Sequence, residues 1–182
     1  DADTVTINIT DNGIQTVPAD AITFQTTTKS ILGLQPEDNA DLVSLQPVDP
    51  DGNDIANRNG MPQNMIYGLM DIKVKVDIPG SSTTVTVLLP EPAPQGYKWY
   101  KYSSSQGWYD YSTNVTFNGD RTRLTITLID GGTGDDDGQQ NGIIEDPSGL
   151  GTAPAGSVSS GGGGGGGCFI DTLSTHFTFF SF

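Results

Sequence analysis

The residue types best suited to chemistry lie in a glycine-rich acidic stretch, residues 130–146, which reads DGGTGDDDGQQNGIIED. Adjacent carboxylates repel one another unless water or a cation neutralises them. Oxygen ligands on such a loop are the ones that Ca²⁺ prefers. We therefore predict Ca²⁺ as a cofactor, with four aspartates as its ligands: Asp130, Asp135, Asp136 and Asp137. The alternative is a solvated turn, in which Asp and Gly are common without any metal.

A second acidic stretch, residues 49–59, reads DPDGNDIANRN and offers further oxygen ligands for Ca²⁺: Asp49, Asp51 and Asn53. It lacks the Glu at the twelfth position of an EF-hand loop, and no helical pattern flanks it. The sequence therefore excludes an EF-hand. A solvated turn is again the alternative.

An aromatic segment, residues 97–111, reads YKWYKYSSSQGWYDY and holds both tryptophans and five of the six tyrosines. Sugar-binding surfaces use such rings, so Trp99 and Trp108 are candidate contacts for surface glycans. The alternative is a hairpin whose alternate rings pack in the core or shield an edge.

The remaining composition argues against catalysis. The single histidine, His176, lies in the C-terminal segment, which argues against both a Ser-His-Asp and a Cys-His arrangement. No phosphate-binding loop, dinucleotide fingerprint or zinc spacing occurs. We predict that the protein is not an enzyme. A net charge of −14 with only eight Lys and Arg also disfavours nucleic acid and anionic membranes as partners.

The elements that must position these residues are strands. Apolar and polar residues alternate with a period of two, without a helical period, in several segments: 4–10, 21–28, 70–78, 83–89 and 121–129. Turns rich in Gly, Pro, Asn and Asp separate them. This pattern predicts an all-β fold, an antiparallel β-sandwich of immunoglobulin-like or jelly-roll-like type. We predict a sandwich body over residues 1–146, a Gly/Ser/Pro linker over 147–167 and a hydrophobic terminal strand over 168–182.

The predicted terminal strand follows seven consecutive glycines and reads CFIDTLSTHFTFFSF. Its apolar residues are the expected subunit contacts: Phe169, Ile170, Leu173, Phe177, Phe179, Phe180 and Phe182. Fifteen residues with polar interruptions are too few for a membrane-spanning helix, which needs about 20 apolar residues. The long tether suits donation of this strand to a neighbouring copy, although closure onto its own sheet stays open. The N-terminal strand, residues 4–10, is an alternative donor.

Three residues are candidates for modification. Cys168 is the only cysteine, so it forms no internal disulfide and is a candidate for lipidation or intermolecular pairing. Asn8 and Asn114 each begin an N-x-T sequon. The abundance of Thr, Ser, Gly and Asn, together with a start at Asp1, leads us to expect an exported protein whose signal peptide has been removed.

Three segments together resemble the bacterial choice-of-anchor U domain: MPQNMIYGLMDIKVKV, TVTVLLPEPAPQGYKWYKYSSSQGWYDY and LTITLIDGGTGDDDGQQNGIIEDPSG. The resemblance covers roughly residues 49–149, and Ser148 stands where that family usually has Gly. The glycine run followed by Cys168, Phe169 and Ile170 resembles a CFI-box C-terminal region. These resemblances imply a bacterial cell-surface or secreted protein, attached or sorted through its C-terminal element, and they imply no catalysis.

Two functions follow from these observations. The first is a structural subunit of an extracellular bacterial filament, in which copies assemble head to tail by donating the C-terminal strand. The alternative is a monomeric, calcium-dependent cell-surface adhesion or carbohydrate-binding module with a C-terminal anchoring or sorting tail.

Overall fold

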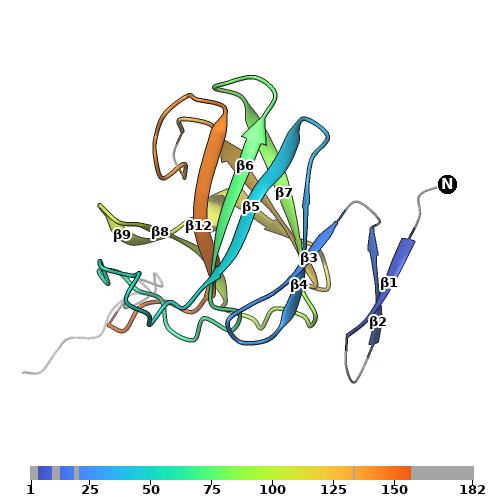
Figure 1. Cartoon of the computed structure of the whole chain (residues 1–182). Coiled ribbons are helices and arrows are strands. Elements are labelled where there is room, and N and C mark those ends of the chain that lie inside the picture. Colours follow the sequence, from blue (N-terminus) through green and yellow to red (C-terminus); the bar gives the residue numbers. More distant parts are fainter. Residues whose placement is uncertain (1–3, 10–12, 19–20, 133, 157–182) are drawn as a thin grey trace, which may run out of the picture.

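The computed structural model describes residues 4–9, 13–18, 21–132 and 134–156. These residues form two five-stranded antiparallel sheets packed on one another, together with a separate two-stranded hairpin (Figure 1). The described ranges contain no α-helix, and their one helical element is a 3₁₀ turn, η1, at Ser112–Asn114. The prediction of an antiparallel β-sandwich is therefore confirmed.

Each sheet mixes strands that are distant in the sequence. The first sheet has the order β10 (Val115–Phe117), β11 (Arg123–Ile129), β7 (Ser82–Leu88), β4 (Ile31–Pro36) and β3 (Ile22–Gln25). The second has the order β5 (Ala40–Val48), β6 (Leu69–Val76), β12 (Ile143–Gly151), β8 (Lys98–Ser103) and β9 (Gly107–Asp110). The hairpin consists of β1 (Thr4–Ile9) and β2 (Gly13–Pro18).

The main core lies between the two sheets, because the inner faces of the central strands carry mostly apolar side chains. β6 reads LMDIKVKV and β11 reads RLTITLI, so Leu, Ile and Val alternate with polar residues along both strands. Ile72 and Val74 on β6, and Ile126 and Leu128 on β11, have no exposed surface. The five segments with predicted alternation each overlap an observed strand: β1, β3, β6, β7 and β11.

A second, smaller cluster lies on the other face of the second sheet. It is built from Ile55, Leu69, Tyr100, Tyr102 and Trp108. Ile55 belongs to the loop between β5 and β6, and this loop covers the outer face of β8 and β9. As a result β8 is buried on both faces, which explains why it has no clean alternation of polar and apolar residues.

The predicted start of the linker at residue 147 is wrong. Residues 147–151 form the second half of β12, where Ser148 and Leu150 pair with β8 and are fully buried. The glycines here serve close packing, since a Cβ added to Gly149 would lie 2.5 Å from the carbonyl oxygen of Gly68. The rest of the predicted linker and the predicted terminal strand lie outside the described residues, apart from residues 152–156.

Candidate functional site

A buried ion pair lies on the inner face of the second sheet, at the end of the core that the acidic loop covers. Lys101 on β8 and Asp146 on β12 are 1% and 0% exposed, and the Lys101 Nζ lies 3.0 Å from the Asp146 Oδ1. Lys101 is in register with Ser148, so Asp146 is its diagonal neighbour on the adjacent strand. Sequence reasoning missed this pair. The available signal was a lysine inside the aromatic strand that contains Trp99 and Tyr102.

The groups around this pair are mostly aromatic or backbone. The Lys101 ammonium donates a hydrogen bond to the carbonyl oxygen of Gly134 and lies 4.3 Å from the centre of the Tyr111 ring. The Tyr111 hydroxyl in turn donates to the carbonyl oxygen of Thr127 at 3.0 Å. Burial, followed by the charge of Asp146, raises the pKa of Tyr111. Within the described residues, neither carboxylate oxygen of Asp146 accepts a hydrogen bond.

The acidic loop is held by Asp130, which bonds to backbone amides. The Asp130 Oδ2 accepts hydrogen bonds from the N–H of Gly80 at 2.6 Å and from the N–H of Gly142 at 3.0 Å. Asp130 has no exposed surface. This carboxylate therefore ties the turn between β6 and β7 to the start of β12.

Asp135 has a similar role inside the loop. Its Oδ2 accepts from the N–H of Gly131 at 2.8 Å, and its Oδ1 accepts from the N–H of Glu145 at 3.0 Å. Burial raises the pKa of Asp135, and these two hydrogen bonds offset part of that rise. Two of the four predicted calcium ligands thus accept hydrogen bonds from backbone amides of the loop and of the turn between β6 and β7.

The other two predicted ligands of this loop are exposed. Asp137 accepts from the N–H of Gln139 at 2.8 Å and from the side-chain amide of Asn141 at 2.7 Å, while Asp136 faces solvent. Across the described ranges, no group of three or more His, Cys, Asp or Glu side chains is arranged to hold a metal ion. Two of the four aspartates are thus buried and two are exposed, and calcium binding stays a prediction.

A cation of the protein itself occupies the second acidic loop. The Arg58 guanidinium donates to the carbonyl oxygens of Asp51 at 2.8 Å and Gly52 at 3.1 Å, and it pairs with the Asp51 carboxylate at 3.5 Å. The Asp49 carboxylate accepts from the N–H of Asp51 at 3.0 Å, and Asn53 is exposed. Of the three predicted calcium ligands of this loop, Asp51 therefore contacts a guanidinium, which supplies positive charge to its carboxylate.

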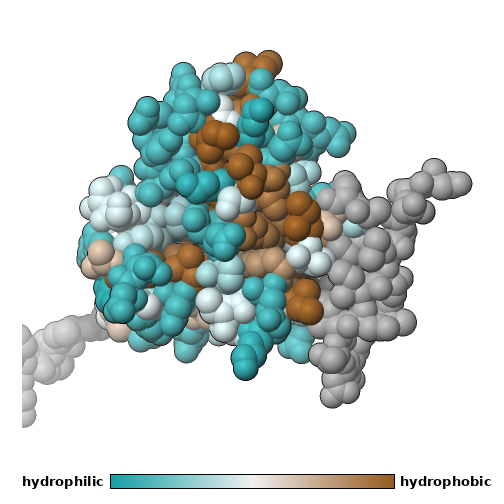
Figure 2. Space-filling view, in the orientation of Figure 1, coloured by the Kyte–Doolittle hydropathy of each residue, from teal (hydrophilic) through white to brown (hydrophobic). Residues whose placement is uncertain are grey.

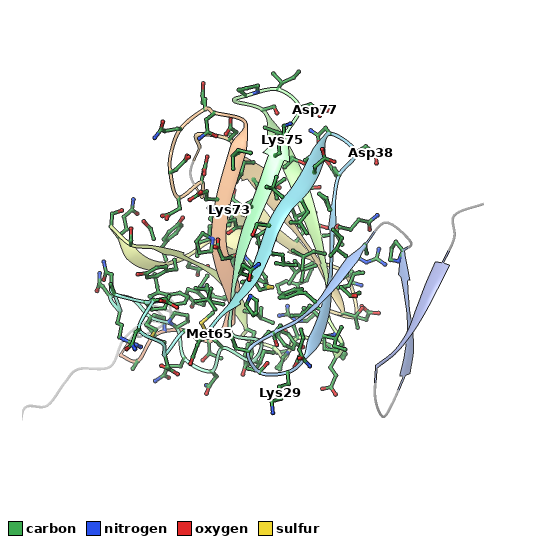
Figure 3. All side chains as sticks on the ribbon, viewed as in Figure 1. Lys29, Asp38, Met65, Lys73, Lys75 and Asp77 are labelled. Atoms are coloured by element: carbon green, nitrogen blue, oxygen red, sulfur yellow. The ribbon has the colours of Figure 1, made fainter. Side chains whose placement is uncertain are left out.

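A further lysine neutralises the acidic loop from outside. Lys73 on β6 pairs with Glu145 on β12 at 2.5 Å, and that hydrogen bond raises the pKa of Lys73. Figure 3 shows Lys73 and Lys75 along β6. Each of the two strands that flank β12 therefore places a lysine beside a carboxylate of β12. The pair with β8 is buried, and the pair with β6 is partly exposed.

The aromatic segment forms the β8–β9 hairpin, as the alternative interpretation predicted. Trp99 is 0% exposed and belongs to the main core, and Trp108 is 5% exposed and lies 5.2 Å from the Tyr102 ring. Buried rings cannot stack on a sugar, so the prediction that Trp99 and Trp108 contact glycans is wrong. Between this hairpin and the acidic loop lies a hollow of about 460 Å³, lined by Ser103, Tyr109, Gly134, Asp135 and neighbouring residues.

An apolar surface lies on the side of the sandwich where β3 and β5 are the edge strands. Within the described residues β3 pairs only with β4, and β5 pairs only with β6. Ile22 on β3 is 47% exposed and Val43 on β5 is 56% exposed. Three half-buried side chains on these strands pack against the core: Phe24, Leu42 and Leu45. Figure 2 shows apolar atoms gathered over β5 and toward β3. We call these five residues the apolar edge.

The remaining predicted sites are only partly covered. Asn8 lies on β1, and Asn114 ends η1 with its side-chain amide donating to the Thr113 hydroxyl at 3.3 Å. Cys168 and the predicted contact residues of the tail lie outside the described residues. In the part of the chain that the structure describes, no helix is long and apolar enough to cross a membrane.

No protein-family model matches the chain, and comparison with curated proteins and with solved structures gives no match either. The class that the structure defines is an antiparallel β-sandwich with a buried Lys–Asp pair in its core. The resemblances to the choice-of-anchor U domain and to the CFI box stay predictions.

Proposed function

We propose that the protein is a structural subunit of an extracellular bacterial filament, in which the C-terminal strand of one copy adds to the apolar edge of the next. The observation that carries this proposal is the apolar edge itself, where exposed aliphatic side chains lie on two strands that each have one edge without a pairing partner within the described residues. Such edges template pairing with another chain unless they are protected.

The protection of β5 is confined to parts of the strand. Pro47 near its end cannot donate to a ladder, and Asp41 near its start places a charge on the edge. Between them lie Leu42, Val43 and Leu45, with Val43 at a bulge in the register with β6. The centre of β5 is therefore the part best suited to receive an apolar strand.

The tail has the complementary pattern. Leu173, Phe177 and Phe179 alternate with polar residues, which gives one apolar face to an extended strand. Burying each such side chain contributes about 1.5–3 kcal/mol, while ordering each residue costs about 1–2 kcal/mol. Burial alone therefore does not offset the cost of ordering the tail. Ladder hydrogen bonds are needed as well, and the edge of β3 or β5 would supply them.

The tether is long enough for exchange between copies. The eleven residues 157–167 reach roughly 36–40 Å when fully extended. A head-to-tail contact of this kind generates a polymer of identical copies when the rotation between successive copies does not close into a ring. The net charge of −14 and the composition rich in Thr, Ser and Gly are consistent with an exported protein.

A second candidate is the monomeric cell-surface adhesion or carbohydrate-binding module with an anchoring tail. An open polar groove at the end of β4 and beside β7 favours it, because its hydroxyl, amide and carboxyl groups suit a polar ligand. Its lining includes Gln35, Glu37, Asp38, Asn39, Thr84 and Thr86. Glycan-array binding by a chain ending at Ser160, abolished by Asn39→Ala, would favour this candidate over the filament.

The filament proposal is tested by electron microscopy and sedimentation of the full chain beside a chain that ends at Ser160. We expect filaments from the full chain alone. Ile22→Lys and Val43→Lys, which place charges on the apolar edge, should also abolish assembly. Ile78→Lys is the matched control, because Ile78 is 69% exposed but lies in the turn between β6 and β7. Single particles in every sample at high concentration would contradict the proposal.

A further inference from the structure

The buried pair of Lys101 and Asp146 is the feature that the proposed function does not use. The protein has three other ion pairs within the described residues, and in each of them the lysine or arginine side chain is at least 35% exposed. Lys101 and Asp146 are instead sealed between the sheets at 1% and 0% exposure. Their Nζ and Oδ1 atoms are 3.0 Å apart, which is contact distance for two groups that can condense.

The surroundings are poor for a carboxylate. Buried charges are normally satisfied by several hydrogen bonds, because removing an ion from water is costly. Within the described residues Asp146 has the Lys101 ammonium beside it and no hydrogen bond to either oxygen. An amide formed from the two side chains would carry no charge, so the cost of removing two ions from water would not apply to it.

The surroundings suit an amide better. Lys101 already donates to the carbonyl oxygen of Gly134, and an amide N–H at the same position would keep that acceptor. The neighbouring Tyr111 ring and Trp99 give the site apolar walls.

We propose that Lys101 and Asp146 condense into an intramolecular amide that links β8 to β12. A proton passes from the ammonium to the carboxylate, and the neutral Nζ attacks the carboxyl carbon. The new C–N bond forms, one C–O bond breaks, and that oxygen leaves as water with two protons from the amine and the acid. Atoms and charge balance without an oxidant or co-reactant.

The fold supplies what this reaction needs. Two groups fixed on neighbouring strands react with a very high effective concentration, because the entropy cost of bringing them together was met on folding. The water released has a route out, since Gly134, which contacts Lys101, also lines the hollow beside the acidic loop. The bond would join two strands that are paired through residues 98–101 and 148–151.

The test is the intact mass of the full chain, measured under denaturing conditions after folding. We expect a mass lower than that of the sequence by one water molecule. After proteolysis, tandem mass spectrometry should find peptides from β8 and β12 joined through Lys101 and Asp146. A wild-type chain with the full sequence mass, and with these peptides separate, would overturn the proposal.

Two variants separate the amide from other losses of water. Lys101→Arg keeps a cation but has no primary amine, so it should have its full sequence mass, whereas Lys98→Arg on the same strand should keep the loss. Asp146→Asn should release ammonia in place of water and reach the same final mass as the wild type. A loss of water that persists in Lys101→Arg would place the loss elsewhere, as in a succinimide at an Asp-Gly step, and would refute the amide.

Discussion

Replacing Asp130 with alanine tests whether the acidic loop is held by its own carboxylates. The Asp130 Oδ2 accepts two backbone N–H groups, at 2.6 Å from Gly80 and 3.0 Å from Gly142. Hydrogen bonds to a charged group contribute about 1.5–3 kcal/mol each, so the pair contributes about 3–6 kcal/mol. The Asp130 Oδ1 accepts no hydrogen bond within the described residues, and its desolvation offsets part of this gain. We therefore expect Asp130→Ala to lower the free energy of unfolding by about 3 kcal/mol.

Urea unfolding is the suitable assay, because Trp99 and Trp108 are buried and their fluorescence reports loss of the core. With a urea dependence of about 2 kcal/mol per molar, the midpoint should fall by about 1.5 M. Asp130→Asn keeps an acceptor for the two amides and should lose less. Asp136→Ala, an exposed neighbour in the same loop, should stay within about 0.5 kcal/mol of the wild type. Equal midpoints for Asp130→Ala and Asp136→Ala would refute the role assigned to Asp130.

Three further predictions concern packing, pH and metal. Gly149→Ala would place a Cβ 2.5 Å from the Gly68 carbonyl oxygen and should cost at least about 1–3 kcal/mol in urea unfolding, whereas Gly119→Ala has open space and should cost far less. Burial raises the pKa of Asp71, so the native state binds its proton more tightly than the unfolded state, and the stability that Asp71 contributes falls as pH rises above its ordinary value of 3.8. Asp71→Asn removes this term, so its stability relative to the wild type should increase with pH in that range; a constant difference across a pH series of urea unfolding curves would contradict this. The calcium prediction is tested by the thermal midpoint: Ca²⁺ that binds the folded loops should raise it, and a chelator should reverse the rise. An unchanged midpoint would contradict calcium binding and would leave the backbone amides and Arg58 as the groups that balance these carboxylates.

The strands that were predictable are those in which apolar and polar residues alternate clearly along the chain. β6 and β11 alternate along their whole length, and the sequence places both within a few residues of their observed ends. β8 could not be recognised in this way, because its two faces enter two different clusters and nearly all its residues are buried. The same double burial explains why Trp99 and Trp108 looked like candidates for an exposed binding surface.

The buried pair was beyond prediction from the sequence. Lys101 and Asp146 are 45 positions apart, and only the register of β8 with β12 makes them neighbours. The register depended on residues 147–151, whose Pro, Ser and Gly content is typical of a linker. Carboxylates such as Asp130 were recognised as important by their clustering, but clustering does not distinguish a metal ligand from an acceptor of backbone N–H groups.

The position of β12 has a consequence for the order of events during synthesis. This strand is the last one described in the chain, yet it is the middle strand of the second sheet, between β6 and β8. Until residue 151 has left the ribosome, the strand that pairs with both β6 and β8 is missing and the second sheet cannot be completed. Completion of the second sheet therefore waits for β12, although all five strands of the first sheet precede it in the chain.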